Sequence, residues 1–217
     1  MWGIKGEGNN MTESRQLSGF SALDLSVDAN VSYTQDSVYR LEITAQQNIL
    51  AVMDTKVEAG ELVIGFKRNV WNYNTVNIII HSPDMNRIKL SGSGNIQVEN
   101  TLSANSLELD VSGSGNISVP TASLQSLTAR ISGSGNIRMN KGSCISETIR
   151  VSGAGSINTE FVNSENADVK ISGSGNVTLS ASKTLNVEIS GSGDVKYRGQ
   201  PKISTSISGS GNLIALD

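Results

Sequence analysis

The chain has 217 residues, a formal net charge of −3, 4% aromatic residues, and 22 glycines against 3 prolines. This length allows one continuous core, but so few aromatic residues argue against large ligand pockets. The weak negative charge, with no basic cluster longer than Lys67–Arg68, argues against nucleic acid as a partner.

The first 90 residues are irregular, but they carry traces of a motif that repeats further along the chain. Residues 5–10 read Lys-Gly-Glu-Gly-Asn-Asn, and 21 residues later the chain reads Ser-Val-Asp-Ala-Asn-Val. The 65 residues between Ser26 and Ser91 have room for about three coils of roughly 20 to 22 residues. We therefore expect irregular solenoid coils over residues 1–90, with Trp2 in an N-terminal cap or a mobile end.

Alternating apolar residues predict strands at 41–44, 61–66 and 76–80. Ala59–Gly60 is typical of a turn between two of these strands. Residues 45–51 fit one helical turn, but helical periodicity is nearly absent elsewhere. No run approaches the about 18 apolar residues of a membrane-spanning helix, so the sequence predicts an all-β fold without a transmembrane segment.

Residues 68–74, Arg-Asn-Val-Trp-Asn-Tyr-Asn, break the alternation and place two aromatics among three asparagines in a predicted loop. Aromatic rings and amides suit sugar rings and protein interfaces alike. The candidate binding residues are Arg68, Trp71, Asn72, Tyr73 and Asn74. The alternative is that the two aromatics cover the side or end of the core, where a solenoid needs a cap.

From residue 91 onward, one phrase recurs: an apolar residue followed by Ser-Gly-Ser-Gly-Asn-Ile or a near copy. The seven copies begin at Ser91, Ser112, Ser132, Ser152, Ser172, Ser190 and Ser208, with spacings of 21, 20, 20, 20, 18 and 18 residues. Around each copy, apolar residues and glycines alternate with polar residues, which is strand periodicity and not that of a flexible linker. The pattern predicts a right-handed parallel β-helix with coils of about 18–21 residues over 91–217, within a single domain over 1–217.

The glycines of the phrase fall on the inward parity, where a side chain would collide with the backbone of a tight corner. Stacked coils should bring the residue after the second glycine into one column of hydrogen-bonded side chains, like other asparagine ladders. This structural column comprises Asn95, Asn116, Asn136, Ser156, Asn176, Asp194 and Asn212. The fourth copy departs from the phrase at Ala154 and Ser156, which should weaken its corner.

Cys144 and His81 are the single cysteine and histidine of the chain. They cannot supply a zinc site, and a catalytic pair would have to meet across about three coils, so a buried structural thiol is expected. Glycine-rich nonapeptide repeats bind calcium through an aspartate, but only Asp194 is acidic at the corresponding position here. We therefore expect no metal and no cofactor.

The segments Phe20–Leu23, Val31–Gln35 and Glu61–Ile64, together with the Ser-Gly-Ser-Gly-Asn-Ile series, resemble the auto-transporter adhesin head domains, also called the GIN domain family, over residues 6–217. The resemblance implies a right-handed parallel β-helix, an origin in Bacteroidota, and export to the cell surface or periplasm behind a secretion or lipoprotein signal. Residues 1–5 lack the features of such a signal, and the resemblance favours a trimmed chain. It brings no catalytic residues with it.

Two functions from different classes fit these observations. The first is a non-catalytic surface or periplasmic module that binds a glycan, a surface protein or another copy of itself. The second is a polysaccharide lyase or hydrolase, because parallel β-helices also carry such enzymes. Glycosidases need two carboxylates across a cleft, but Glu108 and Asp110 share one strand face and no third group is placed with them. The sequence favours the binding module over an enzyme.

Overall fold

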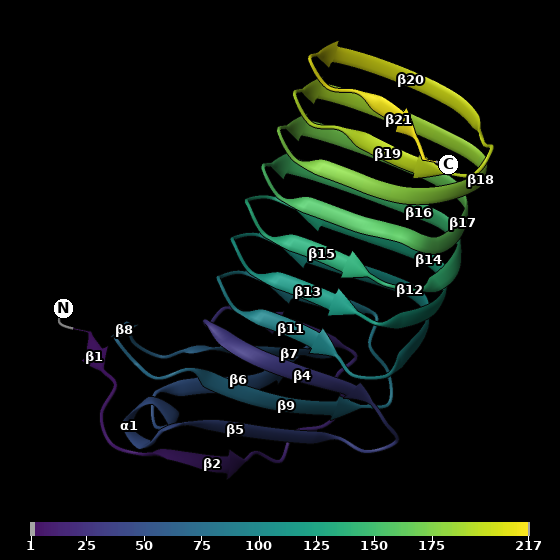
Figure 1. The fold of residues 1–217 in the computed structure, drawn as a ribbon. Coiled ribbons are helices and arrows are strands. Elements are labelled where there is room, and N and C mark those ends of the chain that lie inside the picture. The colour runs from purple at the N-terminus through teal and green to yellow at the C-terminus, as the bar shows by residue number, and fades with distance from the viewer. Residues whose placement is uncertain (1–2, 217) are drawn as a thin grey trace.

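The structure, a computed structural model, describes residues 3–216, so the expected position of Trp2 lies outside the described residues. Parallel strands are stacked coil upon coil from the N-terminal to the C-terminal half of the molecule (Figure 1). The prediction of an all-β solenoid is confirmed. Within residues 3–216, no helix is long and apolar enough to cross a membrane.

Each regular coil has one strand that enters a glycine corner and one that leaves it. The entering strands of the first four regular coils are β10 (Arg87–Leu90), β12 (Thr101–Val111), β14 (Thr121–Ile131) and β16 (Gly142–Gly153). The strands leaving the first three corners are β11 (Asn95–Val98), β13 (Asn116–Val119) and β15 (Asn136–Met139). Further on, β17 (Ser156–Gly173) and β18 (Asn176–Gly191) bend through the opposite turn and serve two coils each, followed by β19 (Val195–Arg198), β20 (Lys202–Gly209) and β21 (Leu213–Ala215).

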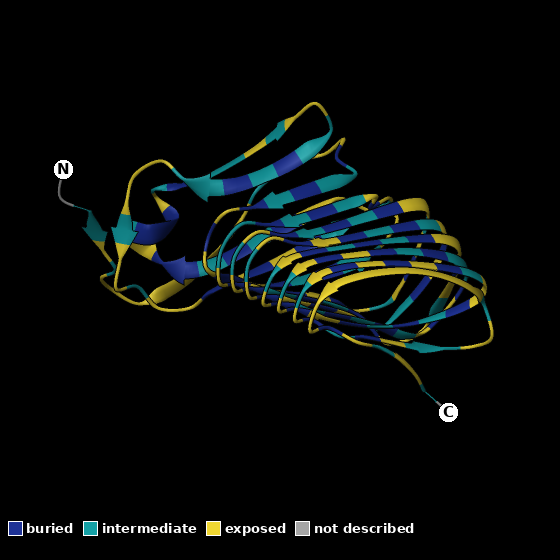
Figure 2. Ribbon diagram, turned by 90° about the horizontal axis from the view of Figure 1, so that it is seen from above, coloured by how far each residue is buried: buried dark blue, intermediate teal, exposed yellow. Residues whose placement is uncertain are grey.

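The strand alternation determines what lies inside the coils. Leu107, Leu109 and Val111 of β12 are buried, whereas Glu108 and Asp110 between them point outward. Figure 2 shows the same alternation of buried and exposed residues along the strands inside the stack, whereas the terminal strand β20 is exposed throughout. Fully burying one such aliphatic side chain contributes about 1.5–3 kcal/mol, so the apolar columns are the main stabilising element of the stack.

The glycine corners stack so closely that backbone touches backbone. A Cβ atom at Gly115 would overlap the carbonyl oxygen of Gly94 and lie 2.5 Å from Leu90 Cδ2. Gly135 is buried, and a Cβ there would overlap the carbonyl oxygen of Gly115 in the same way. The first glycine of the fourth copy, Gly153, has a φ of 146°, which residues with side chains rarely adopt. Glycine is therefore required at these three positions.

The N-terminal region differs from the expected three coils between Ser26 and Ser91. One coil, β3 (Ala22–Leu25) and β4 (Ala29–Gln35), pairs in parallel with β10 and β11, and a second, β7 (Glu61–Phe66) and β9 (Val76–Ser82), pairs in parallel with β3 and β4. The other strands pair antiparallel: β6 (Met53–Glu58) with β7, β5 (Arg40–Gln46) with β9, and β2 (Asn10–Ser14) with β5. Two short strands, β1 (Ile4–Lys5) and β8 (Val70–Trp71), form a separate parallel pair.

The physical reason for this departure is the turn between β6 and β7. Ala59 and Gly60 have φ values of 50° and 81°, and two consecutive left-handed residues make the tight reversal of a hairpin. A two-residue turn joins antiparallel strands, whereas another parallel coil needs a long crossover. The predicted turn is thus confirmed, but it makes β6 antiparallel to β7, so that β6 does not form one of the expected coils.

The antiparallel strands and one short helix close the N-terminal end of the solenoid. The predicted helical turn is present as α1 (Gln47–Leu50), which buries Ile49 and Leu50. The guanidinium of Arg15 donates to the carbonyl oxygens of Leu50, at 3.0 Å, and Met53, at 3.1 Å. The end of the stack is therefore capped, as exposed edges of parallel sheets require.

Candidate functional site

The predicted binding segment, residues 68–74, lies at the N-terminal end of the molecule. Trp71 is 54% exposed, and its Nε1 donates to the carbonyl oxygen of Gly3 at 3.1 Å. Its backbone also pairs with Lys5 through the β1–β8 ladder. The indole is thus held in place with much of its surface in solvent, which lowers the entropy that a ligand would have to remove on contact.

The rest of the segment divides into exposed and structural residues. Asn72 is exposed at a left-handed backbone position, with φ of 47°. The backbone N–H of Asn74 donates to Gln46 Oε1 at 2.9 Å. Tyr73 is partly buried and packs edge-on against Phe66, with 5.6 Å between ring centroids. Tyr73 therefore fits the alternative role of covering the core.

Arg68 and Tyr73 line an open hollow of about 390 Å³ together with Asp28. Burial, and then the nearby carboxylate of Asp28, raise the pKa of the Tyr73 phenol. The phenol consequently stays protonated at neutral pH. The hollow offers a cation, a carboxylate and a hydroxyl group, which suits a polar partner.

The predicted corner column begins in the N-terminal region. Asn95 Nδ2 donates to Asn30 Oδ1 at 3.1 Å, Asn116 Nδ2 donates to Asn95 Oδ1 at 2.8 Å, and Asn136 Nδ2 donates to Asn116 Oδ1 at 2.8 Å. The trace of the phrase at residues 26–31 thus joins the column through Asn30. The earlier trace does not, because it leads directly into β2, which pairs antiparallel with β5.

Beyond Asn136 the column is interrupted and then resumes. Ser156 stacks between Asn136 and Asn176, but in the described part of the chain its hydroxyl makes no hydrogen bond. Asn176 Oδ1 accepts from the backbone N–H of Asp194 at 3.0 Å, and Asp194 Oδ1 accepts from Asn212 Nδ2 at 2.9 Å. Most polar groups of the column therefore form hydrogen bonds within the column, as in an internal structural ladder.

The single cysteine and histidine lie in different parts of the fold. His81 Nδ1 lies 3.3 Å from Asp36 Oδ2 on the N-terminal sheet, whereas Cys144 is buried in β16. Burial, and then the charge of Glu147, raise the pKa of the Cys144 thiol to about 12. A thiol that stays protonated is a poor nucleophile. Across residues 3–216, no three His, Cys, Asp or Glu side chains are grouped so as to hold a metal ion.

The two acidic residues considered for the enzyme alternative, Glu108 and Asp110, lie on the outer face of β12. Glu108 Oε2 is 3.7 Å from Arg87 Nε, and its other oxygen contacts Arg130 of the next coil. Asp110 lies opposite Arg130 in the register of the neighbouring strands β12 and β14. This arrangement is a ladder of surface charges.

Sequence analysis missed a carboxyl group inside the core. Glu147 is 1% exposed and stacks between Leu127 and Ala167. Neither of its oxygens has a hydrogen-bond partner, because the nearby hydroxyls of Thr159 and Ser164 donate to carbonyl oxygens of the next coil. Burial raises the pKa of Glu147 to about 7, although those two hydroxyls lower it in part. The only sequence signal was an acid at an inward-facing position.

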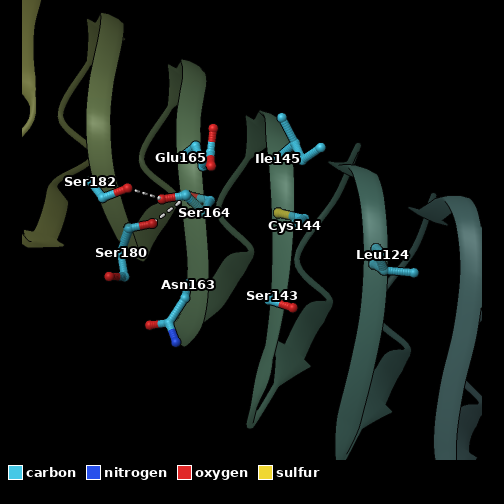
Figure 3. A pocket seen from close by; sticks show the side chains of 9 residues that line it. All are labelled: Leu124, Ser143, Cys144, Ile145, Asn163, Ser164, Glu165, Ser180 and Ser182. Carbon is cyan, nitrogen blue, oxygen red and sulfur yellow. Dashed lines mark hydrogen bonds between the residues drawn. The ribbon is translucent and has the colours of Figure 1, made fainter.

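On the edge opposite the glycine corners, a hollow of about 450 Å³ opens beside Cys144 (Figure 3). Leu124 and Ser164 lie on either side of the thiol, on the neighbouring strands β14 and β17. Ser182 Oγ donates to the Ser164 carbonyl oxygen at 3.2 Å, and Ser164 Oγ donates to that of Ser180. The hydroxyls of Ser164 and Ser182 thus bond to backbone carbonyl oxygens of neighbouring strands.

The fold and these surfaces define a β-solenoid with a closed N-terminal end. Residues 19–201 match the family described as "Putative auto-transporter adhesin, head GIN domain". The chain belongs to this family, which confirms the resemblance seen in the sequence.

Solved structures of similar proteins extend over nearly the whole chain. A putative adhesin from Bacteroides fragilis is 26% identical, with a TM-score of 0.93 over 99% of this chain and 100% of its own. A putative adhesin from Parabacteroides merdae is 22% identical, with a TM-score of 0.87 over 99% of both chains, and is similar in fold. A putative lipid binding protein from Parabacteroides distasonis is 25% identical, with a TM-score of 0.82 over 99% of both chains. A comparison with curated proteins finds no match.

Proposed function

We propose that this protein is a non-catalytic, adhesin-like module of the cell surface or periplasm, which binds a surface glycan or protein through the Trp71 segment. The observation that carries the proposal is the pre-positioned indole: Trp71 is 54% exposed while its N–H is fixed by Gly3. Exposed tryptophans commonly dominate binding energies at interfaces. Arg68, Asn72 and Asn74 supply exposed polar groups in the same segment.

Export is supported by the family and by the structural neighbours described as adhesins. The net charge of −3 argues against nucleic acid as the partner. Self-association through the same exposed indole is the alternative use of this surface. The lyase or hydrolase alternative gains no support, because Glu108 is held between arginines and Glu147 is enclosed in the core.

The test uses a Trp71→Ala variant on a glycan array and in pull-downs with bacterial surface proteins, alongside light scattering. Trp71→Ala should keep the circular dichroism and melting temperature of the native chain and lose roughly tenfold or more in affinity. Val38→Ala is the matched control, because it also removes an exposed apolar side chain, lies outside the segment and should bind normally. If Trp71→Ala binds undiminished, the proposal is wrong; if it unfolds, the indole is part of the cap.

A further inference from the structure

A second groove runs along the edge of the solenoid opposite the glycine corners. It has a volume of about 750 Å³ and adjoins the hollow of Figure 3, sharing Ser143, Asn163 and Ser180 with it. It crosses several successive coils, from Thr121 to Arg198. The groove therefore extends along the axis of the stack, the direction in which a linear polymer would lie.

The floor of this groove carries a row of polar side chains in strict register. Ser123 pairs with Ser143, Ser143 with Asn163, and Asn163 with Ser180. Stacked strands place such groups about 4.8 Å apart. In the part of the chain that the structure describes, these four side chains make no hydrogen bonds. Unlike the corner column, this row therefore has hydroxyl and amide groups that are available to hydrogen-bond a ligand.

One aromatic ring stands at the side of the groove. Phe161 is 56% exposed, and the guanidinium carbon of Arg198 lies 5.9 Å from its ring centroid. Arg198 Nη2 is in turn 2.8 Å from Glu160 Oε1. The ring projects because residues 160–162 have no counterparts on β18, where the register shifts between Thr159 and Asn163. The exposed ring is thus a fixed feature of the longer coil.

The charges lining the groove favour an anion. Lys141 is exposed and, among residues 3–216, has no ion-pair partner, while Arg198 shares its charge with Glu160. Two cations therefore face one carboxylate. A low-dielectric wall strengthens the attraction between such an excess charge and an anionic ligand.

We propose that this groove binds a linear acidic oligosaccharide, one whose sugars carry carboxylates. The face of one sugar ring would stack on Phe161, as apolar sugar faces do on aromatic rings. The hydroxyls of successive sugars would bond to the row from Ser123 to Ser180, whose spacing is close to the length of one sugar unit in an extended chain. Lys141 would pair with a carboxylate. This site is separate from the Trp71 segment, so the proposal for either site can be refuted without affecting the other.

Isothermal titration with hexagalacturonate and with its methyl ester tests the proposal. Native protein should bind the acid form and bind the ester more weakly. Phe161→Ala should weaken binding of the acid roughly tenfold or more, and Lys141→Gln should weaken the acid but not the ester. Lys183→Gln is a matched control that should bind normally, since Lys183 pairs with Glu165 outside the larger groove.

Several results would overturn the proposal. These are no binding of hexagalacturonate, equal affinity for the ester, or unchanged binding by Phe161→Ala. Binding of anionic phosphatidylglycerol vesicles in place of the oligosaccharide would assign the groove to lipid instead. Circular dichroism checks that each variant is folded, and the exposure of Phe161 and Lys141 leads us to expect native spectra.

Discussion

The buried carboxyl of Glu147 makes the free energy of unfolding depend on pH in a way that a single substitution should remove. The side chain stacks in an apolar column between Leu127 and Ala167, with no hydrogen bond to either oxygen. Leucine has a similar volume and fits the chemistry of that column. We therefore expect Glu147→Leu to stabilise the protein wherever the native carboxyl would be ionised.

The magnitude follows from the shift in pKa. Burial raises the pKa of Glu147 from 4.5 to about 7, and one pKa unit corresponds to about 1.4 kcal/mol. The folded state retains the proton between these two values while the unfolded state releases it. The free energy of unfolding therefore falls as pH rises through this window, by about 3 kcal/mol in total, and is constant again above it. Below the unfolded pKa this penalty is absent.

Urea denaturation followed by circular dichroism, at about pH 4 and about pH 8, measures this effect. Other groups titrate alike in both proteins and cancel in the difference. The advantage of Glu147→Leu over the native chain should grow by about 3 kcal/mol between the two pH values. Glu147→Gln should show the same pH dependence with a smaller absolute gain, because its amide remains without partners. An advantage that is equal at both pH values would refute the reasoning.

Three further predictions concern the corners, the column and the thiol. Gly113→Ala should lower the free energy of unfolding by about 1–3 kcal/mol, because the added methyl overlaps the Gly92 carbonyl oxygen. The control is Gly92→Ala, whose methyl would lie 3.8 Å from the nearest atom. It should change the free energy of unfolding by less than about 0.5 kcal/mol. Equal melting temperatures for these two variants would contradict the corner packing. The double variant Asn116→Ala, Asn136→Ala should lose roughly 1 kcal/mol of the free energy of unfolding per lost hydrogen bond, measured by urea denaturation. Both proposed ligand sites should stay intact. Loss of binding in the folded double variant would make the column the functional face. Burial and the charge of Glu147 raise the pKa of the Cys144 thiol to about 12. The thiol should therefore react slowly with an aromatic disulfide reagent in the folded protein and rapidly in concentrated guanidinium chloride. Fast reaction of the folded protein would show that the thiol is accessible.

The regular coils were predictable because they depend on local pattern. Alternation over residues 107–119 indicates which side chains face inward, and the repeated glycines mark the corner. The column followed from stacking alone, since equal positions in successive coils must coincide. The strands expected at 41–44, 61–66 and 76–80 are present as β5, β7 and β9, whereas β2 and β6 were not expected. Alternation is also the same in parallel and antiparallel strands. The direction of β6 relative to β7, for example, depends on the turn at Ala59–Gly60, which reverses the chain.

The candidate sites were harder to predict, because they depend on how coils of different length meet. The exposed Phe161 follows from three residues without counterparts in the next coil, and the sequence shows this only as a repeat that shortens from 20 to 18 residues. The aromatic pair of residues 68–74 was identified, but not its division of roles. Tyr73 packs on Phe66 while Trp71 is tethered to the N-terminal strand, and both contacts bring together segments distant in sequence.

The order of coils in the stack also affects how the chain can assemble during synthesis. The coil of β3 and β4 is covered on one side by β7 and β9 and on the other by β10 and β11, all of which follow it in the chain. Residues 22–35 therefore leave the ribosome well before either covering layer exists. From Thr101 onward, by contrast, each new coil can dock at once on a completed one. We therefore expect the N-terminal block to form slowly, because its contacts are non-local, and the repeats to add to it one coil at a time.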